Sequence, residues 1–403
     1  MLGRFGAIFS AMSLSDRTEM DAVGTACPTV ANRIRSKIFR SLEDQGFEIR
    51  GDQLVPPEAR DKSQIRGLHE EAVRHNRARS RAGLERHEDR LLARVANGPE
   101  VVPDDVSPVL AEVLAGSEEE LLFRYARLHW SIPVSAGYGR RLRFVVYDES
   151  NDKLIGIIGL GDPVFGLGPR DGWIGWDLEA RKKRLKSVMD LFVLGAVPPY
   201  SHLLCGKLVA LLASSREVQE SFREKYGGKA SYISGQTFDG RLALLTTMSA
   251  LGRSSLYNRL RYRTRTVYES VGFTSGSGDF HFSNGFYGDL RQLAIQHCEA
   301  TAKHPSWGVG FRNRRELVRK ALPLLGLSTN LQYHGVRREI FAVPLAENTK
   351  AFLRGEDDEL RPNGQRVDDL FDYFRERWLL PRAGRDQRYR NFRRKSYRLW
   401  GTR

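Results

Sequence analysis

The chain has 403 residues, of which 64 are Lys or Arg and 49 are Asp or Glu, so its formal net charge is +15. This length allows two or three domains of roughly 150 residues, which is enough to bury a sizeable core. The charge excludes an acidic solubilising protein and favours an anionic partner, most often a nucleic acid.

The cysteines, Cys27, Cys205 and Cys298, are odd in number and far apart in the sequence. No CxxC occurs, and no Cys/His pair has the spacing of zinc ligands, so the sequence predicts neither a disulfide scaffold nor a metal site. The longest apolar runs are too short to cross a bilayer, so we expect no membrane segment. These features indicate a protein of the reducing cytoplasm.

The charge is unevenly distributed along the chain. Residues 1–120 carry a net charge of −4, residues 121–373 carry +10, and the last thirty residues carry +9. Such asymmetry is typical of a tail that makes an interaction. We expect a mainly helical N-terminal region over 1–120, an α/β core over 121–300, a C-terminal extension over 301–373 and a basic aromatic tail over 374–403.

The N-terminal part has mostly helical patterning. Ile34, Ile38 and Leu42 follow a helical period, and Gly46 supplies a stop. Residues 47–57 then alternate like a short hairpin that ends at two prolines. Residues 58–96 are polar and helix-prone, so the sequence predicts an irregular helical segment there.

The middle of the chain changes to strand patterning. Residues 142–150 and 153–163 predict a hairpin, and further strands are expected at 173–176, 193–199 and 241–250. One helix is expected over 201–227, and a second helix is expected to end in residues 267–273. The alternation predicts the α/β (α+β) class, with a mixed sheet flanked by helices.

After residue 300 the patterns are weaker. Residues 312–327 predict a basic helix broken at Pro323, and residues 338–345 predict a strand. Residues 368–380 predict an amphipathic helix that Pro381 stops.

One candidate binding element is the strand, loop and helix start around residues 193–212. The first N–H groups of a helix are unpaired and its dipole end is positive, so such a junction can hold an anion. Gly206 and Lys207 are the candidate residues, although a complete P-loop and a dinucleotide fingerprint are both absent. The alternative is an ordinary strand–helix junction in which Gly206 permits close packing.

The order of elements over residues 124–275 resembles the Gcn5-related acetyltransferases. In that family a hairpin feeds a central strand, and a pyrophosphate loop, a helix and a further strand follow. The resemblance implies an acetyltransferase-like fold and acyl-CoA as a possible cofactor. Tyr268, in the pattern Tyr-x-x-x-Gly-Phe, matches the general-acid tyrosine of the family. The alternative is a tyrosine packed on the sheet.

A further candidate is Asp177, which follows the expected strand at 173–176. A carboxylate at a strand end can serve as a general base, and one of Trp173 and Trp176 could stack a base or a substrate ring. The alternative is a pair of core tryptophans beside an ion pair.

An arginine-rich segment follows the strand at 241–250. Five arginines occur within thirteen residues without an acidic residue, and Tyr257 and Tyr262 lie among them. Arginine pairs with phosphates and tyrosine can stack on bases, so the segment predicts a nucleic-acid contact. A solvated basic face is the alternative. The five candidates are Arg253, Arg259, Arg261, Arg263 and Arg265.

The last thirty residues contain eleven basic and six aromatic residues. Proteins that bind single strands or RNA combine basic residues, which contact phosphates, with aromatic rings, which stack on bases. The alternative is a docked tail whose rings pack on its own domain. The candidate binding residues are Arg388, Arg390, Arg393, Arg394 and Lys395.

Ordered motifs over about residues 120–355 resemble the Druantia protein A family of bacterial anti-phage defence. They include HWSIPVSAGYGRRLRFVVYDE, GDPVFGLGPRDGWIGWD, AVPPYSHLLCGKLVALL and TTMSALGRSSLYNRL. The resemblance implies a cytoplasmic component of a multi-gene immunity system, encoded beside several partners that include a very large helicase-like protein. It supplies no established catalytic residues.

Two functions follow from these patterns. The first is a non-catalytic subunit of this defence system that binds DNA or RNA or acts as a scaffold, with no cofactor. The alternative is an acyl-CoA-dependent transferase that modifies a nucleic acid or a protein, with Asp177 and Tyr268 as base and acid. Whether the chain is an enzyme stays open at this point.

Overall fold

The structure is a computed structural model that describes residues 28–56, 62–134, 139–230, 235, 237–282, 286–300 and 311–401. Cys27 and residues 58–61 of the expected helical segment lie outside these ranges. The chain divides into two compact units. The small unit combines Met1–Ala72 with Ser275–Val336, and the large unit combines Val73–Thr274 with Arg337–Arg403. The units therefore interleave along the chain instead of following one another.

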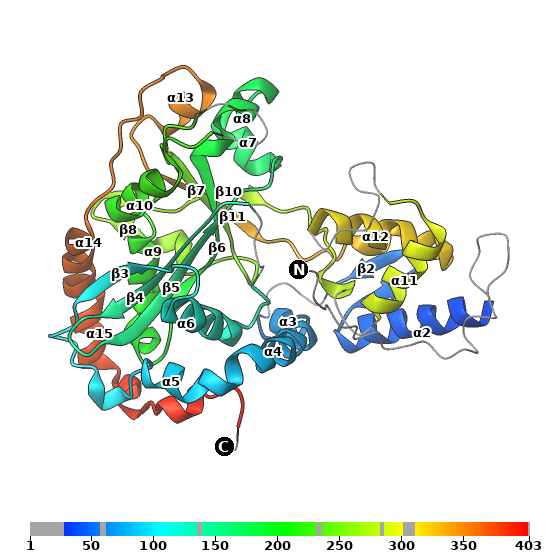
Figure 1. Cartoon of the computed structure of the whole chain (residues 1–403), viewed down its shortest axis with the longest axis horizontal. Coiled ribbons are helices and arrows are strands. Elements are labelled where there is room, and N and C mark those ends of the chain that lie inside the picture. The colour runs from blue at the N-terminus through cyan, green and yellow to red at the C-terminus, as the bar shows by residue number, and fades with distance from the viewer. Residues whose placement is uncertain are drawn as a thin grey trace, which may run out of the picture. The chain divides into compact units, whose positions relative to one another are not determined.

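The small unit combines helices with a two-stranded hairpin, and α2, α11 and α12 lie near this hairpin (Figure 1). Helix α2 buries Ile34, Ile38 and Leu42, and the chain turns at Gly46, where φ is +93°. The expected helix and its glycine stop are confirmed, as is the hairpin that follows. The elements are α2 (Pro28–Asp44), β1 (Glu48–Arg50), β2 (Gln53–Val55), α3 (Lys62–Gly67), α11 (Tyr287–His297) and α12 (Phe311–Leu324).

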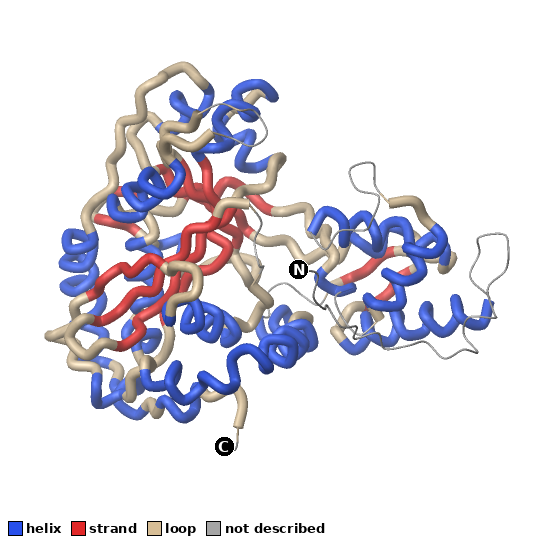
Figure 2. The backbone as a smooth tube through the Cα atoms, in the orientation of Figure 1, coloured by secondary structure: helices blue, strands red, loops and turns tan. Residues whose placement is uncertain are grey.

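Seven strands form a mixed sheet in the large unit, in the order β10-β11-β7-β6-β5-β4-β3 (Figures 1 and 2). Neighbouring strands are antiparallel except β6 and β7, which are parallel. The expected class, a mixed sheet flanked by helices, is confirmed. The strands are β3 (Pro108–Glu112), β4 (Arg141–Asp148), β5 (Lys153–Gly161), β6 (Val188–Ala196), β7 (Leu244–Met248), β10 (Glu269–Phe273) and β11 (Glu339–Pro344).

Both faces of this sheet are covered. On β4, Phe144 and Val146 point into the core cluster that includes α9 and α14, whereas Val145 between them points into the cluster that includes α5 and α6. Strand β5 is buried along almost its whole length, which is why its sequence is an unbroken apolar run without alternation. The helices are α4 (Glu70–Leu84), α5 (Glu88–Ala93), α6 (Glu118–Ala126), α7 (Gly168–Ile174), α8 (Leu178–Arg184), α9 (Cys205–Leu212), α10 (Arg216–Tyr226), α13 (Thr349–Arg354), α14 (Val367–Phe374) and α15 (Leu380–Arg385).

Two expected elements of the middle region are wrong. Residues 173–176, expected as a strand, form the end of α7 and its cap, because Pro169 starts a helix and Gly175, at φ +80°, ends it. Residues 267–273, expected as a helix end, form β10, in which Glu269 pairs with Ala342 of β11. That pairing joins residues far apart in the sequence, so local periodicity does not reveal it.

Two expected helices have different bounds. The single helix expected over 201–227 is two helices, α9 and α10, because Ser215 caps a new start by accepting the N–H of Val218 (3.4 Å). The helix expected to stop before Pro381 continues through it as α15. Five residues of π-helix, Arg375–Leu379, precede the proline, and Pro381 lies in the first turn of α15, where a missing N–H does no harm.

Candidate nucleic-acid interface

The arginine-rich segment forms an irregular excursion between β7 and β10. It contains a short 3-10 turn, η6 (Tyr257–Arg259), and a two-residue hairpin of β8 (Arg261–Tyr262) and β9 (Arg265–Thr266). Arg263 lies in the turn of this hairpin with a left-handed φ of +53°. In this hairpin Arg261 and Arg263 are exposed, whereas Tyr262 between them is buried.

A buried carboxylate anchors this segment to the sheet. Glu339 of β11 is 4% exposed and accepts hydrogen bonds from the N–H of Ser254 (3.2 Å), from Asn258 Nδ2 (2.8 Å) and from Ser270 Oγ (2.8 Å). Ser254 and Asn258 are thus used to hold the loop in place. No sequence pattern marked Glu339, because its role depends on residues about eighty positions away.

Two stacked tyrosine rings fill the space beneath the segment. Tyr257 and Tyr268 lie 4.6 Å apart with an interplanar angle of 14°, and the Tyr268 hydroxyl donates to the carbonyl of Ala210 in α9 (2.9 Å). Burial raises the pKa of Tyr268 well above its usual value. Tyr268 is 1% exposed and its hydroxyl is already hydrogen-bonded, so this tyrosine packs on the sheet as the alternative describes.

Four arginines of the segment, Arg253, Arg259, Arg261 and Arg263, are exposed. Within the described ranges, none of the five candidate arginines forms an ion pair with a carboxylate. Many other arginines of the large unit do, such as Arg140 with Asp162 (2.7 Å) and Arg398 with Glu88 (3.4 Å). The segment therefore carries uncompensated positive charge.

The fold brings a second group of cations to this segment. Lys207 of α9 lies over the ring of Trp378 (5.2 Å), and Arg377 lies over the same ring (5.3 Å). The ring of Tyr373 contacts both Trp378 and Tyr262, which links the two groups. Burial first, and then the nearby charges of Arg259 and Arg377, lower the pKa of Lys207. We call this group the basic–aromatic surface: Lys207, Arg259, Arg261, Arg263, Arg377, Tyr262, Tyr373 and Trp378.

The tail is docked on the large unit, and most of its rings are core residues. Phe374, Tyr389, Tyr397 and Trp400 are all less than 10% exposed. Arg388 pairs with Asp386 (2.6 Å), and Arg394 lies near Glu100 (3.7 Å). The remaining tail candidates, Arg390, Arg393 and Lys395, are exposed, and in the part of the chain that is described they have no carboxylate partner.

The loop before α9 is closed by its own hydrogen bonds. The N–H groups of Ser201, His202 and Leu204 donate to the carbonyls of Val197, Pro199 and Ser201, and the N–H of Lys207 donates to Leu204. Arg382 of α15 donates to the carbonyl of His202 (3.1 Å). A Cβ at Gly206 would meet nothing within 4 Å, so close packing does not require this glycine. Lys207 is part of the basic–aromatic surface.

Asp177 has a local structural role. It is the N-cap of α8, and its carboxylate accepts the N–H of Ala180 (2.7 Å).

A carboxyl group that the sequence did not single out, Asp190 of β6, accepts the hydroxyl of Thr246 (2.8 Å). Burial raises the pKa of Asp190 to about 6, against the opposing effects of Thr246 and Arg170.

Other classes of site are less well supported. Among the residues described, no group of three or more His, Cys, Asp or Glu could hold a metal ion. No described helix is long and apolar enough to cross a membrane. Cys205 is buried and Cys298 is half-buried, and both are free thiols.

Comparisons with known proteins agree on one family. The family model described as "Druantia protein DruA" matches residues 59–355. The chain is 39% identical over 359 residues to the Druantia protein DruA of Escherichia coli (strain UMEA 4076-1), a match that covers 89% of each chain. No solved structure matches significantly. The chain therefore belongs to the DruA family of Druantia proteins, and this membership supports a role in Druantia anti-phage defence.

Proposed function

We propose that the chain is a nucleic-acid-binding subunit of a Druantia defence system and that its basic–aromatic surface contacts phosphates. The observation that carries this proposal is the convergence of cations from three separate segments. Lys207 comes from α9, Arg259 to Arg263 come from the arginine-rich segment, and Arg377 comes from the π-helix before α15. The described part of the chain places no carboxylate in ion-pair contact with them.

Like charges held together favour an anionic partner. Arg259 and Arg377 both disfavour the charged form of Lys207, so the lysine is stabilised when an anion binds beside it. Arginines bind phosphate oxygens through two parallel hydrogen bonds, and their contacts to the backbone of a nucleic acid do not depend on sequence. We infer binding to DNA or RNA with little base specificity.

Family membership supports a proposal about the surrounding system. We infer a cytoplasmic protein that assembles with other Druantia proteins, among them a large helicase-like protein. A protein that binds the phosphate backbone of a nucleic-acid strand suits such a complex, because it can bind and deliver nucleic acid of any sequence. The tail is docked, so we assign the first contact to the basic–aromatic surface and a supporting one to Arg390, Arg393 and Lys395.

Replacing Arg259, Arg261 and Arg263 together by alanine should weaken binding to every sequence alike. Each phosphate contact contributes about −0.7 to the slope of log affinity against log salt for a single strand, so the slope should become shallower by about 2. This corresponds to roughly a hundredfold loss of affinity at about 0.1 M salt. Fluorescence anisotropy with labelled single-stranded DNA, duplex DNA and RNA measures both quantities.

A control variant of equal charge replaces Arg79, Arg86 and Lys183, which are exposed residues of the large unit outside the surface. It should leave the salt slope almost unchanged. Equal losses in the two variants would show that net charge alone drives binding. A chain that binds no nucleic acid, yet still joins a complex with its Druantia partners, would be a scaffold and would contradict the proposal.

A second candidate, an acyl-CoA-dependent transferase, is favoured by one feature of the sheet. Strands β6 and β7 are parallel, they pair over only three residues each, and a loop and α9 follow β6. This order agrees with the hairpin, strand, loop, helix and strand expected for an acetyltransferase-like core. The closed hydrogen bonds of residues 201–204 and the buried hydroxyl of Tyr268 count against it.

Thermal unfolding with acetyl-CoA separates the two candidates. A ligand at about 100 times its dissociation constant stabilises the folded chain by roughly 2.7 kcal/mol, which a melting curve detects easily. The nucleic-acid proposal predicts a shift no larger than that caused by adenosine 3′,5′-bisphosphate, which is the nucleotide portion of coenzyme A. A concentration-dependent shift with acetyl-CoA and free coenzyme A that this bisphosphate does not reproduce would favour the transferase.

A further inference from the structure

The large unit contains a cavity that no function discussed so far uses. Its volume is about 540 Å³, within the range of small-ligand sites. One wall is the hairpin strand β9 with Arg265 and Thr266, and the next residue of the wall is Glu269 of β10. The other lining residues come from the chain between the end of β11 and α13, from Trp173 of α7 and from Asn363.

Two cations line this cavity without a carboxylate partner among the described residues. Arg265 is half-buried, and burial lowers the pKa of its guanidinium. Lys350 is on the rim with its ammonium group 4.2 Å from the centre of the Trp173 ring. A third cation, Arg354, is already bound to Glu356 by two hydrogen bonds of 2.6 Å. A half-buried guanidinium with no carboxylate at ion-pair distance is costly, and a directly bound anionic ligand removes that cost.

Hydrogen-bond acceptors line the same cavity. Asn363 also lines the cavity, but its side-chain oxygen, Oδ1, is shielded from solvent and does not face the open space. Glu269 and Glu347 also line the cavity, and in the described ranges neither carboxylate forms an ion pair. A ligand that fits must therefore offer both an anionic group and several N–H or O–H donors.

We propose that this cavity binds one nucleoside monophosphate unit, with its phosphate between Arg265 and Lys350 and its sugar hydroxyls or base amino groups on Glu269 and Glu347. A phosphate satisfies the two cations, and the hydroxyl and amino groups of a nucleoside satisfy the acceptors. The choice of a nucleotide over other phosphates rests on the proposed function, because Arg265 belongs to the same hairpin as Arg261 and Arg263. The unit is either a free nucleotide or the phosphorylated end of a strand.

Calorimetric titration of the full chain tests this site. The probes are the four ribonucleoside 5′-monophosphates, the matching nucleosides and inorganic phosphate, all at one ionic strength. We expect at least one nucleotide to bind. Its nucleoside should bind about tenfold or more weakly because it lacks the phosphate contact with the cations. Inorganic phosphate should also bind about tenfold or more weakly, because it lacks the hydrogen bonds to the carboxylates. Competition by short oligonucleotides, with and without a 5′-phosphate, shows whether a strand end also enters.

Two variants make the result specific. Arg265→Met and Lys350→Gln should each weaken the nucleotide by about tenfold, whereas Arg86→Met, at an exposed arginine outside the cavity, should not. Absence of binding by all four nucleotides, phosphate as tight as the nucleotides, or unchanged binding by both variants would overturn the proposal. Salt-dependent strand binding that persists in those cases would show that only the cavity inference has failed.

Discussion

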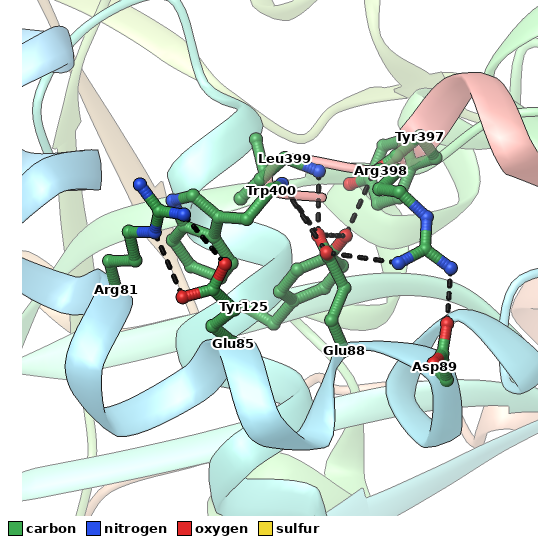
Figure 3. Close-up of polar contacts among 9 residues, drawn as sticks. All are labelled: Arg81, Glu85, Glu88, Asp89, Tyr125, Tyr397, Arg398, Leu399 and Trp400. Atoms are coloured by element: carbon green, nitrogen blue, oxygen red, sulfur yellow. Dashed lines mark hydrogen bonds and ion pairs between the residues drawn. The ribbon is translucent and has the colours of Figure 1, made fainter. Parts of the chain in front are cut away.

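Replacing Glu88 by leucine should lower the free energy of unfolding of the large unit by about 3–5 kcal/mol, because one partner of a buried, hydrogen-bonded charge is removed. Glu88 is only 2% exposed. Its carboxylate accepts the hydroxyl of Tyr125 (2.8 Å) and the backbone N–H groups of Leu399 (2.6 Å) and Trp400 (3.1 Å), as Figure 3 shows. Arg398 adds an ion pair at 3.4 Å.

The loss is large because the two backbone donors are left inside the protein without an acceptor, whereas the Tyr125 hydroxyl keeps the carbonyl of Tyr397 (2.9 Å) and Arg398 keeps Asp89. A buried donor that loses its acceptor costs about 1–3 kcal/mol, and two of the donors are backbone groups that no side-chain rearrangement can satisfy. The rings of Tyr397 and Trp400 dock beside them in the cluster that includes α5 and α6. We therefore expect the last residues to detach first, so that limited proteolysis removes the C-terminus before the rest unfolds.

The measurement is unfolding in urea followed by tryptophan fluorescence, since five of the six tryptophans belong to the large unit. Glu85→Leu is the matched control. Glu85 lies three residues before Glu88 and pairs with Arg81 at the surface (2.8 Å), as Figure 3 also shows. That exposed pair should contribute little. Similar midpoints for the two variants would show that Glu88 does not hold the tail.

Elements whose signal is local were predicted correctly. The hairpin of β4 and β5 turns at Asn151 and Asp152, where Asp152 has a left-handed φ of +55°, and its apolar residues mark both strands. Helix α2 has a regular apolar face and a glycine stop. Strand β10 was predicted as a helix because its identity comes from pairing with β11, about seventy residues later. The interleaved units escape sequence patterns for the same reason.

The candidate interface was predicted in part. The absence of acidic residues marked the arginine-rich segment correctly as uncompensated charge. Its connection to Lys207 and Arg377 depends on how α9 and the π-helix pack around Trp378, which no spacing in the sequence reveals. The composition of the tail favoured nucleic-acid binding, with docking on its own domain as the alternative. Buried rings and one buried carboxylate, Glu88, show that docking accounts for most of its aromatic residues.

Arg170→Met should also lower the free energy of unfolding by about 3–5 kcal/mol. Arg170 is 0% exposed, and methionine replaces its apolar stem but not its buried guanidinium. The guanidinium pairs with Asp171 (2.6 Å) and donates to the carbonyls of Val164 and Phe165 (both 2.9 Å). These contacts fold the loop before α7 onto itself. Without them two carbonyls lose their donor, and the Asp171 carboxylate keeps only Arg181 (2.8 Å) and the N–H of Leu167 (3.0 Å).

The contrast with Arg181→Met separates charge from burial in this network. Arg181 pairs with the same aspartate and lies over the ring of Phe165 (4.5 Å), but its side chain is 22% exposed. Solvent can replace its contacts, so its loss should be clearly smaller than that of Arg170. Because β10 touches α7 where Gly272 approaches Pro169, unfolding of this loop should also loosen the wall that carries Glu269. Equal losses in the two variants would mean that Asp171, and not the buried guanidinium, dominates the stability of this loop.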